Sequence, residues 1–379
     1  MLRNALRYLT LLLLVAPAAG AWGQIRFGST LTLSGSTASY GENARDGMEL
    51  AKEEINRSGG IRGGRLELLY EDFGETDLKR AASAAQKLVT VDRAAALLPM
   101  ITEDAEVVYP IASRNEVVTM AIYAGGRDLT RAKRLFYQIS SADEALVKRL
   151  ADYLLHQGAR SACIVAEEGA YALPLAHFAK DYLKPRLAAQ PALAAYAPQT
   201  MDFRSILARL HASGCVSLML VTPPARQGII LKQLAELRWD PLKLGLDASE
   251  DAAVLETAGE SSDGLVYAKY TTGTPEFQER FKARFGREAG VPAALAYDAV
   301  TILAAAMNRS GTRASKVAAY LDGIRDFHGA SGAISFVDGT RAERPVTLWT
   351  IKKGRPQELT GRGESSPPPA APYERIQGQ

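Results

Sequence analysis

The residues of this sequence best suited to chemistry lie in short polar loops that follow apolar runs. The first such loop, residues 32–41, is small and rich in hydroxyl groups, which suits hydrogen bonding to an anion, although Ser and Thr equally favour the start of an ordinary helix. Later loops add aromatic side chains, further hydroxyls and acids, among them Asp247 directly after an apolar run. Such a set could hold a zwitterion. The later loops are residues 100–103, 122–126, 167–171, 222–224 and 247–250.

No arrangement of residues in the sequence favours catalysis, a metal or a cofactor. The four histidines lie at no spacing typical of metal ligands, and the motifs GxSxG, HExxH and GxxxxGKS/T do not occur. The glycine-rich residues 59–64 follow a predicted helix and precede a predicted strand, whereas a phosphate-binding loop leads from a strand into a helix. We therefore expect a binding protein and not an enzyme, with no cofactor and no metal site.

An alternation of apolar strands and amphipathic helices must position these loops. Strands are predicted at 26–31, 66–71, 94–98 and 117–121, and again at 161–166, 216–221, 242–246 and 264–268, with helices between them. This order predicts an α/β fold in two similar lobes, each with a parallel sheet covered by helices. Ligands of such sheets bind outside the carboxyl ends of the strands, where the polar loops lie.

The chain after residue 270 has a different pattern. Helices are predicted at 275–285, 293–308 and 314–324, and strands at 332–336 and 346–352. This part is too short for a third lobe, so we expect it to complete both lobes by crossing between them, and such crossings form a hinge. The first lobe is predicted to contain residues 24–141 and about 270–331, and the second residues 142–269 and about 332–358.

The two ends of the chain have compositions unlike its middle. Residues 1–23 have the features of a secretory signal peptide, namely Arg3 and Arg7, an apolar run at 9–15 and small residues at 19–21. No cysteine follows the expected cleavage point, so we predict a periplasmic protein without a lipid anchor. Residues 359–379 are rich in proline and predict a disordered tail. With 45 basic and 42 acidic residues, the chain is too nearly neutral to suggest nucleic-acid binding.

The sequence contains two cysteines, Cys163 and Cys215, each at an apolar run. A disulfide could form in an exported protein. Because a free cysteine packs as a small hydrophobic residue, we predict two buried structural thiols instead.

Several segments match, in order, those of a known family. The most specific is residues 32–41, followed by 47–51 and 55–61; weaker matches are 202–210, 258–264, 296–299 and 332–339. Together they resemble the Leu/Ile/Val-type (branched-chain amino acid) periplasmic binding proteins of ABC transporters, over nearly the whole chain to about Leu359. The resemblance implies the type 1 periplasmic binding protein fold, in which two Rossmann-like lobes are joined by three crossovers and enclose the ligand by hinge closure.

The resemblance also implies which residues contact the ligand. Asp247 matches the acid that receives the ligand's ammonium group, although it could instead cap the following helix. In the first lobe the family's paired hydroxyls are replaced by Ile101 and Thr102, and its Ser-Ala-Thr loop by residues 123–125. The ligand is then an amino acid, an aromatic or aliphatic acid, an amide or another small solute. The expected ligand-binding residues are Ser34, Tyr40, Ile101, Thr102, Tyr123, Ala124, Gly125, Tyr171 and Asp247.

The function implied is that of a monomeric solute-binding protein that delivers a small molecule to an ABC permease. Two alternatives remain at this stage. One is a sensory or regulatory module of the same fold, and the other is an envelope enzyme or enzyme activator, because one fold hosts unrelated functions.

Overall fold

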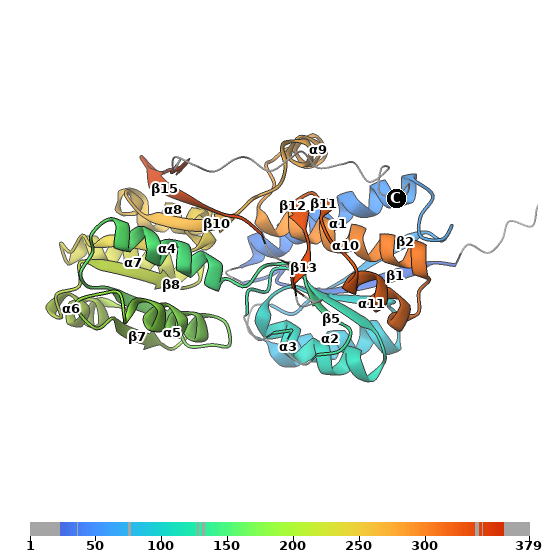
Figure 1. Cartoon of the computed structure of the whole chain (residues 1–379), viewed down its shortest axis with the longest axis horizontal. Helices are drawn as coiled ribbons and strands as arrows, with labels where there is room; N and C mark the ends of the chain where they lie inside the picture. Colours follow the sequence, from blue (N-terminus) through green and yellow to red (C-terminus); the bar gives the residue numbers. More distant parts are fainter. Residues whose placement is uncertain are drawn as a thin grey trace, which may run out of the picture.

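The computed structural model describes residues 23–359, except 36, 75–76, 127–128, 131–132, 338–340 and 343. It confirms the predicted α/β fold: two lobes lie side by side, each built on its own seven-stranded sheet (Figure 1). Residues 1–22 of the predicted signal peptide and residues 360–379 of the predicted tail lie outside the described residues.

The first lobe is built on a sheet with the strand order β13-β14-β5-β4-β3-β1-β2. Its helices form where apolar residues recur at helical spacing, as in α1, whose Ala44, Met48, Ala51 and Ile55 are buried. The first eight elements are β1 (Ile25–Leu31), α1 (Ala38–Arg57), β2 (Leu66–Asp72), α2 (Leu78–Thr90), β3 (Ala96–Pro99), α3 (Thr102–Arg114), β4 (Val118–Ala121) and β5 (Phe136–Gln138).

The second lobe repeats this alternation, with the strand order β16-β15-β10-β9-β8-β6-β7. Strands β6 to β10 pair in parallel, and β15 and β16 add antiparallel strands at one edge. Its elements before the chain returns are α4 (Glu144–His156), β6 (Cys163–Glu167), α5 (Ala172–Leu183), β7 (Ala192–Tyr196), α6 (Arg204–Ala212), β8 (Ser217–Val221), α7 (Pro224–Glu236), β9 (Leu242–Gly245), η1 (Asp247–Glu250), α8 (Ala252–Ala258), η2 (Gly259–Ser262) and β10 (Val266–Tyr270).

The C-terminal part returns first to the first lobe and then to the second. The chain passes between the sheets after β5, after β10 and before β15, which gives the three crossovers that were expected. The elements of this part are α9 (Pro275–Phe285), α10 (Val291–Ser310), α11 (Ala314–Asp322), β11 (Phe327–Gly329), β12 (Gly332–Ile334), β13 (Phe336–Val337), β14 (Arg341–Ala342), β15 (Val346–Lys352) and β16 (Arg355–Glu358).

The last crossover comes later than the predicted boundary at about residue 331. Strands β13 and β14 still belong to the sheet of the first lobe, so the chain crosses between Ala342 and Val346. Phe336 is buried there and packs edge-on against Tyr137, with the ring centroids 5.6 Å apart. Two-residue strands are too short to produce an alternating pattern, which explains the misplaced boundary.

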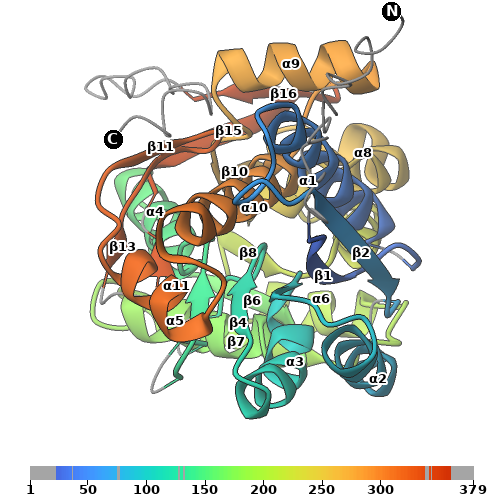
Figure 2. The same cartoon turned by 90° about the vertical axis from the view of Figure 1, so that its right-hand side faces the viewer.

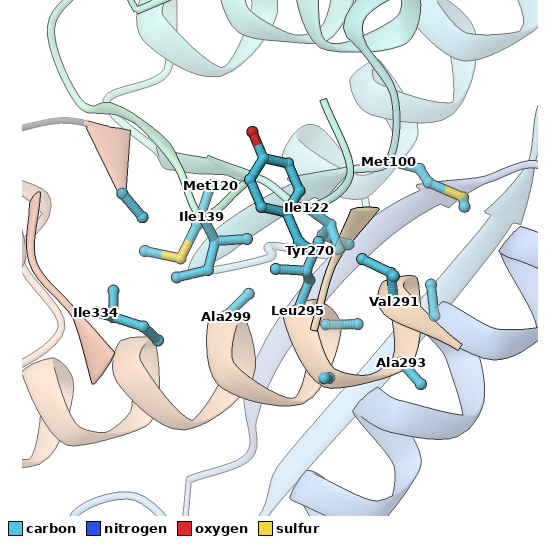
Figure 3. Close-up of a cluster of buried hydrophobic side chains, with 14 of the residues drawn as sticks. Met100, Met120, Ile122, Ile139, Tyr270, Val291, Ala293, Leu295, Ala299 and Ile334 are labelled. Atoms are coloured by element: carbon cyan, nitrogen blue, oxygen red, sulfur yellow. The ribbon is translucent and has the colours of Figure 1, made fainter. Parts of the chain in front are cut away.

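Helix α10 is the central core element of the first lobe. It lies beside α1 (Figures 1 and 2), and a Cβ on Gly47 of α1 would overlap the carbonyl oxygen of Ala293, so glycine permits this close approach. Its apolar side chains face residues of both the sheet and the crossovers, including Ile139 and Tyr270 (Figure 3). Among the described residues, α10 alone is long and apolar enough to cross a membrane, and 94% of its most apolar window is buried inside the protein.

A buried ion pair ties two of the crossovers together. Arg344, just before β15, donates hydrogen bonds to the carbonyl oxygens of Ile139 and Ser331, each at 3.2 Å. Its guanidinium lies 4.0 Å from the carboxylate of Asp298 in α10. That carboxylate also accepts hydrogen bonds from the backbone of Ala330 at 2.5 Å and of Ser331 at 2.8 Å. Both charged side chains are fully buried, so this cluster fixes the hinge region.

The prediction of two free thiols is wrong. Cys163 and Cys215 form a disulfide, with their Cα atoms 5.8 Å apart. Both residues are buried, as expected. Cys163 begins β6 and Cys215 lies just before β8, and these strands are neighbours in the second sheet. A separation of 52 residues in sequence concealed this pairing, because it depends on strand order.

Candidate ligand-binding site

The lobes enclose a cavity of about 310 Å³. Its walls come from the loops that follow β1, β3 and β4 in the first lobe and β6, β7, β8 and β9 in the second. The carboxyl ends of both parallel sheets therefore face one another across it, as expected for ligand sites in such folds. The volume suits a small organic molecule.

The structure brings most of the predicted ligand-binding residues together. Ser34 is outside the cavity: it is exposed, and its hydroxyl donates a hydrogen bond to Asp72 at 2.8 Å. Ala124 is fully buried, and its carbonyl accepts hydrogen bonds from Gln138 and Ser140, each at 2.5 Å. The predicted residues that line the cavity are Tyr40, Ile101, Thr102, Tyr123, Gly125, Tyr171 and Asp247.

Asp247 begins η1 at the end of β9 and faces the opposite lobe. The hydroxyl of Tyr123 donates a hydrogen bond to its Oδ2 across the cavity, and the backbone N–H of Ala248 donates to Oδ1 at 3.0 Å. Burial raises the pKa of Asp247 to about 6, against the opposing effect of the Tyr123 hydrogen bond. Tyr40 packs edge-on against Tyr123, with centroids 5.5 Å apart, and so fixes the orientation of the donor ring.

A second acid, Asp143, lines the same cavity and was not predicted. It lies at the first crossover, where the hydroxyl of Tyr171 donates to its Oδ2 at 2.7 Å. A Cβ on Gly125 would overlap this carboxylate, so glycine is required beside it. Burial, and then the negative charge of Asp247, raise the pKa of Asp143 to about 8. The loop that carries Asp143 follows β5, and because this three-residue strand was not predicted, the loop was not recognised as a strand end.

Hydroxyl groups and tyrosine rings complete the cavity wall. The buried hydroxyls of Thr37 and Thr222 have no hydrogen-bond partner among the residues that the structure describes, so they are available to a ligand. The hydroxyl of Thr102 accepts from the backbone of Gly126 at 3.2 Å and keeps its own proton free to donate. Tyr270 donates to the carbonyl of Ala142 at 3.0 Å, so it is held in place by the first crossover.

The charges around the cavity are of one sign in the part of the chain that the structure describes. Five carboxylates line it, and among the described residues no Lys, Arg or His does. Asp143 and Asp247 are the inner two. The other three, nearer the loops of α3 and α5, are Glu103, Glu167 and Glu168.

Hydrogen bonds between the two lobes hold them close together. The backbone N–H of Tyr171 in the second lobe donates to Glu103 of the first at 3.2 Å. Ser39 of the first lobe donates to Asp251 of the second at 3.0 Å. Together with the bond between Tyr123 and Asp247, these contacts describe a closed arrangement of the two lobes.

Two α/β lobes, a three-crossover hinge and a cavity between the lobes define a class of proteins that close on a small ligand. A family model described as "Periplasmic binding protein" matches residues 24–356. The chain therefore belongs to the periplasmic binding protein family.

Individual relatives agree with this assignment. The Leu/Ile/Val-binding protein homolog 3 of Brucella melitensis is 26% identical over 305 residues, which cover 78% of this chain and 82% of that protein. The crystal structure of the leucine binding protein LivK from Thermotoga maritima is similar with a TM-score of 0.82 at 20% identity, covering 89% of this chain and 98% of that one. An ABC-transporter solute binding protein from Rhodopseudomonas palustris, in complex with 3,4-dihydroxy benzoic acid, is similar with a TM-score of 0.73 at 20% identity, covering 87% and 93% of the two chains.

Proposed function

We propose that this protein is the extracytoplasmic solute-binding component of an ABC importer. It captures one small solute in the cavity between its lobes and presents the closed form to a transmembrane permease. The observation that carries the proposal is the cavity itself, because its wall is shared between both lobes and a bound molecule would therefore hold them closed. Binding-protein membership and the names of the relatives support the proposal.

In this proposal Asp247 is the partner of an ammonium group on the solute. Its carboxylate lies at a strand end in the cavity wall. It does not cap α8, because Asp251 is the residue that accepts the hydrogen bond from the backbone N–H of Ala253, at 2.8 Å. The alternative role for Asp247 as a helix cap is thereby weakened. Tyr40 and Tyr171 supply aromatic walls, and Thr37, Thr102 and Thr222 supply hydroxyls.

A thermal-shift screen of the mature protein, starting at residue 24, tests capture of a solute. The panel contains amino acids, amines, aromatic acids, dicarboxylates and amides. A ligand at 100 times its dissociation constant stabilises the folded state by about 2.7 kcal/mol, which is readily measured as a rise in Tm. Absence of any stabilising solute would contradict the proposal.

Uptake measurements separate an importer from a sensory module. Deletion of the gene should abolish uptake of the labelled solute found in the screen, and the wild-type gene should restore it. Normal uptake in the deletion strain would assign the protein to sensing instead of transport.

A further inference from the structure

We infer that the cavity selects an organic amine that has no carboxylate group, with an aromatic or branched aliphatic body, over the amino acid with the same side chain. This inference rests on the proposed function and names the substrate class of the same site. Three properties of the cavity carry it: its charge, its free hydrogen-bonding groups and its aromatic walls.

The charge of the inner cavity favours a cation. Asp143 and Asp247 each accept a hydrogen bond from a tyrosine, Tyr171 and Tyr123 respectively, and neither forms an ion pair with a basic residue among those that the structure describes. Burial raises the pKa of both acids, and repulsion from a neighbouring carboxylate raises it further, that of Asp247 acting on Asp143 and that of Glu250 on Asp247. A ligand ammonium group relieves this repulsion, whereas a ligand carboxylate adds a further negative charge to it.

The hydroxyl groups of the cavity wall that remain free to donate a hydrogen bond are neutral. The hydroxyls of Tyr123, Tyr171 and Tyr270 already donate to Asp247, Asp143 and Ala142. Ser140, which also lines the cavity, donates to Ala124. Among the described residues that line the cavity, Thr37, Thr102 and Thr222 have side-chain hydroxyls left for a ligand. They can bind a polar group, but they carry no charge that offsets the neighbouring acids.

The walls of the cavity suit a cation with an apolar body. Rings of Tyr40, Tyr123, Tyr171 and Tyr270 line it, and the face of an aromatic ring attracts a cation. The remaining walls are apolar, including Ile101, Leu246 and Leu295. A volume of about 310 Å³ accommodates a single ring or a branched chain.

Isothermal titration of the full mature protein with matched ligands tests the inference. One set of ligands shares a phenyl ring and its short carbon chain. In this set phenethylamine carries only the amine, phenylalanine carries the amine and the carboxylate, and 3-phenylpropanoate carries only the carboxylate. A second set is 3-methylbutylamine, leucine and 4-methylpentanoate. We expect the amine of at least one set to bind at least about 10-fold more tightly than its amino acid, and the acids not to bind.

Each result has a distinct meaning. Equal or tighter binding of the amino acid, or binding of the acid alone, overturns the inference and leaves the proposed function intact. Binding of none of the six ligands, while another solute of the thermal-shift screen binds, also overturns it. Failure of every solute in both experiments contradicts the proposed function itself.

Asp143→Asn tests the second acid with a matched control. The side chain keeps its shape but loses its charge, so the ratio of amine affinity to amino-acid affinity should fall about 10-fold. Asp152→Asn is the control, because Asp152 lies on α4, which begins directly after Asp143, and accepts a hydrogen bond from Tyr182 at 2.7 Å, but does not line the cavity. A purely structural role for Asp143 would weaken both ligands equally and leave the ratio unchanged, which would overturn its part in selection.

Discussion

Tyr123 and Asp247 lie on opposite lobes, 124 residues apart in sequence, and a hydrogen bond joins them inside the cavity. The acid proposed to receive the ligand's ammonium group is therefore also a point at which the lobes meet. A ligand that reaches Asp247 must share it with Tyr123. Ligand binding and lobe closure consequently depend on the same carboxylate.

Asp247→Asn should weaken binding of an amine-bearing ligand by about 10- to 100-fold, because a hydrogen bond to a charged group contributes about 1.5–3 kcal/mol. Isothermal titration measures the change. Asp240→Asn is the control, since that side chain is 86% exposed on the surface and should leave affinity unaltered. Unchanged affinity in the Asp247 variant would remove this residue from the site.

Stability of the ligand-free protein should fall as pH rises from about 4 to 8. The pKa of Asp143 is raised to about 8 and that of Asp247 to about 6, against about 3.9 in the unfolded chain. The folded state thus binds more protons than the unfolded state in this range, so the free energy of unfolding decreases with pH. Buried Asp104, whose pKa is raised to about 7, acts in the same direction.

Melting temperatures measured at pH 5 and pH 8.5 test this dependence. Asp143→Asn should reduce the difference between the two pH values, whereas the surface variant Asp240→Asn should not. Affinity for an amine should change in the opposite direction and increase with pH, because the ionised acids bind the cation. A wild-type protein that is equally stable at both pH values would contradict the raised pKa values.

The disulfide should stabilise the second lobe without affecting ligand binding. Closing a loop of 52 residues corresponds to about 4 kcal/mol in the chain-entropy treatment. The bond lies at the amino ends of β6 and β8, away from the cavity. In urea unfolding, a reductant should lower the free energy of unfolding of the wild type by about this amount. It should not change that of a Cys163→Ala/Cys215→Ala variant. A large change in ligand affinity on reduction would contradict the assignment.

The hinge cluster should be among the most sensitive sites in the first lobe. Asp298→Ala leaves Arg344 buried without its counter-charge, which costs about 3–5 kcal/mol of unfolding free energy. Combining it with Arg344→Met should restore part of the loss, because the charge left unpaired is then removed as well. Denaturant unfolding of the single and double variants measures this coupling. Strictly additive losses would show that the two residues do not interact.

The sequence predicted the lobes because the main strands are apolar runs, as in β8, and the long helices carry apolar residues at helical spacing, as in α1. It did not predict β5, which has three residues, or β7, whose run of alanines is untypical of strands. Asp143 was missed because its loop follows β5. The disulfide was not predicted, and the last crossover was placed too early, because both depend on which strands become neighbours, and that is determined by the tertiary fold.

Most of the candidate site was predictable from loops at strand ends together with the family resemblance. Ser34 and Ala124 were the exceptions. Their types fit the pattern, but the hydroxyl of Ser34 turns to Asp72 and the carbonyl of Ala124 is occupied by Gln138 and Ser140. Only the hydrogen bonds seen in the structure distinguish such residues from the neighbours that line the cavity.

Small-angle X-ray scattering of the mature protein, with and without a saturating solute from the thermal-shift screen, tests the central claim most directly. Capture between two hinged lobes predicts a smaller radius of gyration when the solute is bound, and an Asp247→Asn variant that needs a higher solute concentration to show the same change. A radius of gyration that stays the same while the solute demonstrably binds would contradict capture by closure of the lobes.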